Sequence, residues 1–233
     1  MGDTWEGLSL KPWLLALMVL GSARALMTQA QTVKLKPPLQ PAEALSVTDI
    51  TVPDLPVTNG TVVVDALITE AGKVERVEVR RDIANFTELA VHAVEEWKFS
   101  PATLAGKPVA SRVPVAVTFR PPVSYADPVP LPTLIPQSET AIQAEFQPAE
   151  VIHAAFPNYP ANTVVVGTVV LEVTLSATGK VGEIKVLRDL PPLTEEAKAA
   201  AGDWRFMPAT FNGEPVRSKI ILAFVFTAIF SQS

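Results

Sequence analysis

The chain has 233 residues, 48% of them apolar and 18% charged, with a formal net charge of −5 and no cysteine. This composition is that of a folded chain, long enough for one large or two small globular domains. The absence of cysteine excludes disulfides, thiolate zinc sites and cysteine nucleophiles together. The modest charge and the lack of a basic cluster argue against nucleic acid as a partner.

An apolar block over residues 13–20 lies between two basic residues near the N-terminus. As a helix the block and its margins would be about 18 Å long, which is too short for a hydrocarbon core of about 30 Å, so no stable transmembrane span is predicted. Small residues follow it, with candidate cleavage sites after Ala25 and Ala30. The layout predicts a secretory signal peptide over residues 1–30. An uncleaved anchor or an ordinary buried helix is the alternative.

One repeat organises the rest of the chain. The segment Gly60-Thr-Val-Val recurs 107 positions later at Gly167, and the same offset relates Trp97 to Trp204 without a gap. We therefore predict two copies of one domain, which we expect to be independent because two units are too few for a solenoid. The predicted boundaries are a short linker over 31–39, a first domain over 40–120, a proline-rich linker over 121–146 and a second domain over 147–230.

In chain order, each copy begins with an alternating strand followed by a glycine turn and a second strand. In the first copy, Val62 and Val64 lie on one face, while Thr61 and Asp65 lie on a face that the alternation predicts to be solvated. Gly72 supplies the permissive backbone of the turn. A short helix starting at Pro41, or at Pro148 in the second copy, precedes the hairpin in this prediction. The hairpin itself is expected in both copies.

A helix and a last strand complete the unit. Thr87 and its counterpart Thr194 are predicted as hydroxyl N-caps, and Trp97 lies on the apolar stripe of the first helix. Pro101 prevents the helix from continuing, and alternating apolar residues then predict a strand ending at Phe119. The fold class is therefore α+β: two tandem small β-β-α-β domains, each a three-stranded antiparallel sheet packed against a helix.

No set of residues predicts catalysis, a metal site or a cofactor. His92 and His153 are the two histidines, and the repeat places other residue types at their counterparts, so neither belongs to a duplicated site. We expect His92 on an exposed helix face. Gly72-Lys73 lacks the first glycine of a phosphate loop, and the context is strand-turn-strand. We therefore predict that the chain is not an enzyme and holds neither a metal nor a cofactor.

Several marks, present in both copies, resemble the TonB family C-terminal domain. The second copy has the glycine-led hairpin from Gly167, then Trp204-Arg-Phe-Met-Pro-Ala-Thr, Gly213-Glu-Pro-Val and a closing Phe226. The first copy has the equivalent motifs beginning at Gly60 and Trp97. The resemblance implies a periplasmic domain that binds a short segment, the TonB box, of TonB-dependent outer-membrane receptors by adding it as a strand beside its own last strand.

The resemblance also implies which residues would hold the peptide. Pro114 interrupts the last strand of the first copy, whereas the second copy keeps every backbone donor there, so we expect the second copy to be the peptide-binding one. The resemblance also implies that a tyrosine-proline element before the first strand of the hairpin helps to hold the peptide. The expected peptide-binding residues are Asn158, Tyr159, Pro160, Ile220, Ile221, Leu222, Ala223 and Phe224.

Two features depart from an energy transducer of this family. The apolar block is short, and about ten residues separate Ala30 from the first domain, so a periplasm-crossing arm is not evident. We therefore expect a periplasmic accessory or scaffold, anchored in the inner membrane if the signal is not cleaved. The alternative is a structural module that self-associates with no role in energy transduction, which the apolar tail Phe224–Phe230 favours.

Overall fold

The computed structural model describes residues 39–52, 59–120, 146–160 and 163–227. The predicted signal peptide and nearly all of the predicted proline-rich linker lie outside these residues. Within them, no helix has both the length and the apolar character that crossing a membrane requires.

Each copy folds as a three-stranded antiparallel sheet with a helix, in the order strand, strand, helix, strand. In the first copy the last strand and the second strand pair on either side of the first. The first copy comprises β3 (Gly60–Ile68), β4 (Val74–Arg81), α1 (Thr87–Glu96) and β8 (Ser111–Arg120). The second comprises β11 (Gly167–Leu175), β12 (Val181–Arg188), α2 (Leu193–Asp203) and β16 (Ser218–Phe226). The predicted α+β fold and its β-β-α-β units are confirmed.

Each copy also contains short strands, before its hairpin and between its helix and its last strand. The predicted helix from Pro41 or Pro148 is wrong, because both segments are extended and pair with the strand that follows the helix. The reason is local: Ala44 and Val151 are buried while the residues on either side of them are exposed or half-buried, which is a strand pattern. The first copy has β1 (Leu39–Gln40), β2 (Glu43–Ser46), β5 (Lys98–Ser100), β6 (Ala102–Leu104) and β7 (Lys107–Val109). The second has β9 (Phe146–Gln147), β10 (Glu150–His153), β13 (Arg205–Met207), β14 (Thr210–Phe211) and β15 (Glu214–Pro215).

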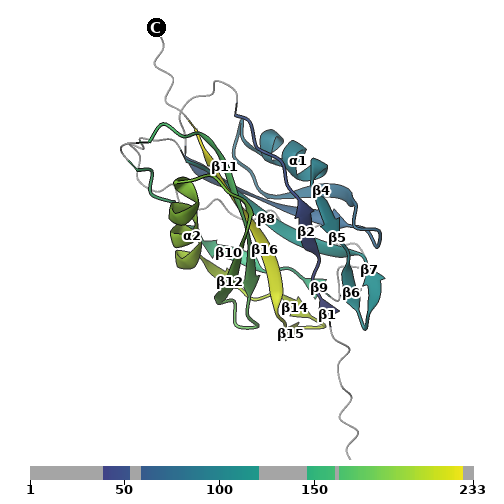
Figure 1. Ribbon diagram of the computed structural model, residues 1–233. Helices are drawn as coiled ribbons and strands as arrows, with labels where there is room; N and C mark the ends of the chain where they lie inside the picture. The colour runs from purple at the N-terminus through teal and green to yellow at the C-terminus, as the bar shows by residue number, and fades with distance from the viewer. Residues whose placement is uncertain (1–38, 53–58, 121–145, 161–162, 228–233) are drawn as a thin grey trace, which may run out of the picture. The chain divides into compact units, whose positions relative to one another are not determined.

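The two three-stranded sheets join into one six-stranded sheet in the order β12-β11-β16-β8-β3-β4 (Figure 1). The junction is parallel: Val115–Arg120 of β8 align with Ile221–Phe226 of β16. The expectation of two independent domains is therefore wrong. Both last strands are largely apolar on both faces, which suits strands in the interior of a sheet. Because they pair with each other, neither is left with an open backbone edge.

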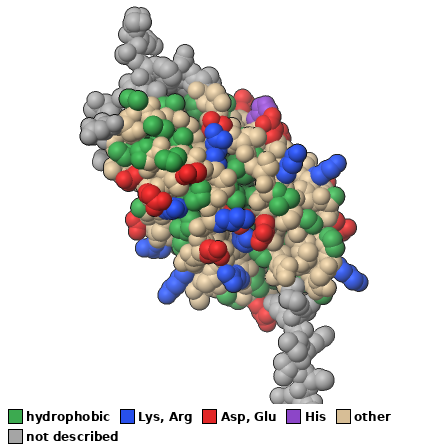
Figure 2. Space-filling model, in the orientation of Figure 1, with side chains coloured by type: hydrophobic (Ala, Val, Ile, Leu, Met, Phe, Trp, Pro, Cys, Tyr) green, Lys and Arg blue, Asp and Glu red, His purple; other side chains and the backbone are tan. Residues whose placement is uncertain are grey.

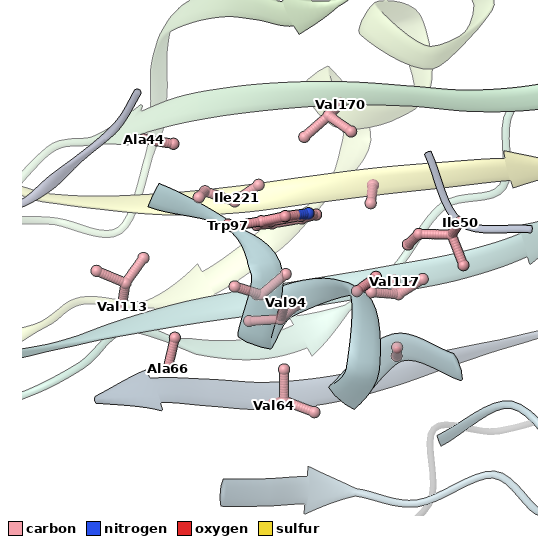
Figure 3. Packing of buried hydrophobic residues seen from close by; sticks show 14 of the residues in the cluster. Ala44, Ile50, Val64, Ala66, Val94, Trp97, Val113, Val117, Val170 and Ile221 are labelled. Carbon is pink, nitrogen blue, oxygen red and sulfur yellow. The ribbon is translucent and has the colours of Figure 1, made fainter. Parts of the chain in front are cut away.

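The parallel junction turns the two copies over relative to each other, so α1 packs on one face of the shared sheet and α2 on the opposite face. Consequently each core contains residues of both copies. Val170 and Ile221 of the second copy belong to the core under α1, beside Trp97 (Figure 3). Val63 and Ala116 of the first copy belong to the core under α2.

This arrangement also corrects the predicted solvated strand face. Asp65 is only 2% exposed and Thr61 is equally buried, because the opposite face of β3 is covered by the other copy. The predicted threonine N-caps are wrong as well. The cap position of α1 is Phe86 and that of α2 is Pro192, neither with a side-chain cap bond. Thr87 and Thr194 lie inside the first turn and accept hydrogen bonds from backbone N–H groups four residues earlier.

The hairpin turns are tied to the strand after the helix. Gly72 has φ +77°, and a Cβ there would lie 2.2 Å from the carbonyl oxygen of Phe99. Gly179 has φ +75° and would meet the carbonyl oxygen of Phe206 in the same way. Glycine is therefore required at both turns for its left-handed backbone and for the close approach of β5 and β13.

Candidate functional site

The five expected peptide-binding residues of β16, Ile220 to Phe224, lie in the middle of the six-stranded sheet. β16 pairs with β11 along all of its nine residues and with β8 along six. The side chains from Ile220 to Phe224 are at most 1% exposed. The expectation that β16 offers a free backbone edge is therefore wrong. Contact of these residues with a peptide stays a prediction.

Pro114 fits the sheet in a way that the sequence did not reveal. It lies opposite Asp65 of β3, and the register with β16 begins at the next residue, Val115. The missing N–H of Pro114 therefore falls just before the first aligned pair. The proline that was expected to weaken β8 as an edge is accommodated at the margin of the junction.

The tyrosine-proline element lies against one end of β16. Tyr159 is 8% exposed, its hydroxyl donates a 2.6 Å hydrogen bond to the carbonyl oxygen of Val165, and its ring meets Phe226 edge to face. Burial raises the pKa of Tyr159 above its usual value. Asn158 is exposed and Pro160 half-buried. The structure thus places Tyr159 beside the last residue of β16 in a packing role.

A buried ion-pair cluster lies where the second copy covers β3. Arg112 of β8 binds Asp65 at 3.1 Å and Glu78 at 3.0 Å. Arg80 connects Asp65, at 3.5 Å, to Glu150 of the other copy, at 3.8 Å. Desolvation by burial raises the pKa of Asp65 to about 6, although the charges of Arg112 and Arg80 oppose the rise. This first ion cluster, built on Asp65, joins the two copies.

A second ion cluster occupies the equivalent place across the junction. Lys219 of β16 binds the buried Glu172 at 2.8 Å and Glu43 of the first copy at 2.6 Å. The other carboxylate oxygen of Glu172 accepts the backbone N–H of Ala44. Hydrogen bonding to Lys219 lowers the pKa of Glu43, and the pKa of Lys219 is raised by these carboxylates against the opposing effect of burial. β2 of the first copy and β10 of the second are thus each held to the sheet of the other copy.

Sequence reasoning missed both ion clusters, but it contained a signal for them. Asp65 and Glu172 occupy equivalent positions, as do Arg112 and Lys219, and Glu43 and Glu150. A charge of the same sign is therefore kept at three pairs of repeat-equivalent positions. The alternation within one copy predicts a solvated face for Asp65, because it does not reveal the copy that covers that face.

The free edges of the shared sheet are β12 and β4, each with a single neighbouring strand in the part of the chain that the structure describes. Five of the eight residues of β4 are charged, against three of the eight in β12. Charged side chains protect an edge from pairing with another chain. β12 is therefore the less protected edge, and Ile184 and Val186 on it are half-buried against the core under α2.

The two histidines lie apart from these features. The side chain of His92 is 77% exposed on α1, as predicted, and is 3.9 Å from Glu96. His153 is exposed at the end of β10. Across the described ranges, no group of three or more histidine, aspartate or glutamate side chains is placed to hold a metal ion.

The comparisons with known proteins agree with the repeat. The family model described as "Gram-negative bacterial TonB protein C-terminal" matches residues 57–121 and 153–228, which together make up more than half of the chain. No curated protein matches the chain. TonB C-terminal domains are protein-interaction domains of envelope proteins that take part in energy transduction for transport. The protein therefore belongs to the family of Gram-negative TonB C-terminal domains, with two matching segments in tandem.

Proposed function

We propose that this protein is a periplasmic TonB-like protein that binds an extended segment of an envelope protein, such as a TonB-dependent receptor, by strand addition. The guest strand pairs with β12. This proposal rests on the observation that β16 and β8 pair with each other, which leaves β12, beside β11, as a terminal strand of the sheet. Each outward backbone N–H and C=O of an edge strand is available to a guest.

The two faces of β12 favour an amphipathic guest. On the side of α2, Ile184 and Val186 pack against the core, so apolar residues of the guest extend that core. Glu183 and Lys185, which alternate with these two residues along β12, are exposed. The guest would therefore alternate apolar residues toward α2 with charged residues on the other side. Displacing β8 from β16 instead would expose a fully buried strand pair, which is far more costly.

Amide hydrogen exchange of the full chain, with a receptor TonB-box peptide and with a scrambled peptide of the same composition, tests the proposal. Binding at β12 slows exchange in residues 181–188 by tenfold or more and leaves residues 218–226 unchanged, because only the terminal strand gains a partner. Faster exchange in 218–226 would mean that the guest displaces β8. No change anywhere would contradict strand addition.

A matched pair of variants separates the edge from general damage. Val186→Pro in β12 and Val79→Pro in β4 occupy equivalent repeat positions, and each removes one backbone donor from a terminal strand. Val186→Pro is expected to weaken peptide binding at least tenfold, whereas Val79→Pro leaves it unchanged. Equal losses would contradict the assignment of the guest to β12.

A self-associating structural module is the second candidate, because the strand edges of this chain already pair with one another in β8 and β16. In that case two copies would pair through their β12 edges. Sedimentation would then detect a dimer that Val186→Pro dissociates, and the box peptide would change nothing.

A further inference from the structure

A pocket of about 280 Å³ lies where β8 and β16 diverge before their parallel pairing begins. Both copies line it, through the first residues of the two strands and through the small flanking sheets. The visible face of the protein mixes basic, acidic and apolar side chains without a region of one sign (Figure 2). The size is near the lower end of small-molecule sites, which span about 300–1,000 Å³.

The walls of the pocket are apolar and come in repeat-equivalent pairs. Leu39 faces the pocket together with its counterpart Phe146, and Leu104 together with its counterpart Phe211. Alanine, valine and proline side chains complete most of the remaining wall. Such a wall suits an aliphatic chain, because each buried methylene stabilises the complex by a similar increment.

The charged groups of the lining favour an anion. Arg112, Arg217 and Lys219 line the pocket, against the single carboxylate of Glu70. The carboxylates that pair with Arg112 and Lys219 do not line it. Arg217 is exposed and has no ion-pair partner among the residues described. Its guanidinium can therefore form a bidentate pair with a carboxylate without breaking an existing ion pair.

The lining also offers an unused hydroxyl. Ser111 Oγ is buried and has no hydrogen-bond partner within the described ranges. A buried hydroxyl without a partner is costly, and an anionic oxygen in the pocket can accept its proton. We propose that this pocket binds an aliphatic carboxylate of short to medium length, with its chain between the two copies and its carboxylate on Arg217. This inference does not rest on the proposed strand addition.

Calorimetric titration of the full chain with octanoate, octan-1-ol and octylamine tests the proposal at one chain length. Octanoate is expected to bind at least tenfold more tightly than octanol, and octylamine more weakly than both. Shortening octanoate to hexanoate weakens binding by about 16-fold, because each of the two methylenes removed contributes about fourfold. Equal affinities for the three head groups, or no binding of octanoate, would overturn the proposal.

Three variants assign the binding to this pocket. Arg217→Gln weakens octanoate binding at least fivefold and leaves octanol unchanged. Ala110→Trp fills the pocket from an exposed lining position and abolishes binding of both. Lys107→Gln removes an exposed positive charge outside the lining and serves as the matched control, with no change expected. Octanoate binding that survives Ala110→Trp, or that falls equally with Lys107→Gln, contradicts the proposal.

Discussion

Replacing Ala223 with aspartate is expected to unfold both copies of the domain together. Ala223 is fully buried at the centre of the shared sheet, opposite Val117 of β8 and Val170 of β11. A carboxylate there has no cation to pair with, and burying it costs several kcal/mol. The whole stability of such a domain is only about 5–15 kcal/mol, so the variant loses most of it.

Hydrogen exchange read by mass spectrometry distinguishes this outcome from local damage. Protection should fall in parallel over residues 60–120 and 167–226, because the two cores share residues. Met207→Asp, at a side chain that is 53% exposed, is the control and should change stability by about 0.5 kcal/mol or less. Retained protection in 60–120 of the Ala223→Asp variant would show that the copies fold separately.

The second large effect is expected from Arg112→Met. Arg112 is the nearest cation to Asp65 and also pairs with Glu78, so the variant leaves a buried carboxylate with Arg80 alone. Removing one partner of a buried pair costs about 3–5 kcal/mol. Urea unfolding at pH 7.5 measures this loss. Arg76→Met, which breaks a pair with Glu78 through an arginine whose side chain is 48% exposed, is the control and should cost less than about 1 kcal/mol.

The deficit of Arg112→Met should shrink as the pH falls. In the wild type the folded pKa of Asp65, about 6, is above its ordinary value of 3.8, so the folded state is favoured by protonation of Asp65. This contribution to stability is complete below about pH 4 and is lost as the pH rises through 6. Without Arg112 that pKa is higher still. Protonation of Asp65 as the pH falls therefore stabilises the variant more than the wild type, and the difference in stability between them decreases. An equal deficit at pH 5.5 and at pH 7.5 would contradict this account of Asp65.

The repeat made the unit of the fold predictable but not its assembly. The alternation of Val62 and Val64, the turn at Gly72 and the stripe ending at Trp97 are local patterns, and each predicts its own element. The parallel junction of β8 and β16 leaves no such local mark. The only sign of it is that each last strand has apolar residues on both faces, such as Ile221 beside Leu222. Such a run indicates a strand that is covered on both faces of its sheet.

The same limit explains the errors at the expected site. Intact backbone donors from Ile220 to Phe224 predict a strand that can pair, but uninterrupted donors suit an interior strand as well as a free edge. Asp65 was placed in solvent because a single copy of the domain cannot reveal what covers its second face. In each case the missing information was the position of the other copy.

Cysteine cross-linking across β8 and β16 tests the shared sheet most directly, since the chain has no cysteine of its own. Val117 and Ala223 are register partners on neighbouring strands about 4.8 Å apart, within disulfide reach. Val117→Cys with Ala223→Cys should form an intramolecular disulfide, detected by mass spectrometry. Val117→Cys with Leu222→Cys, whose side chains point to opposite faces, should not. No disulfide in the first pair, or one formed only between molecules, would contradict the six-stranded sheet.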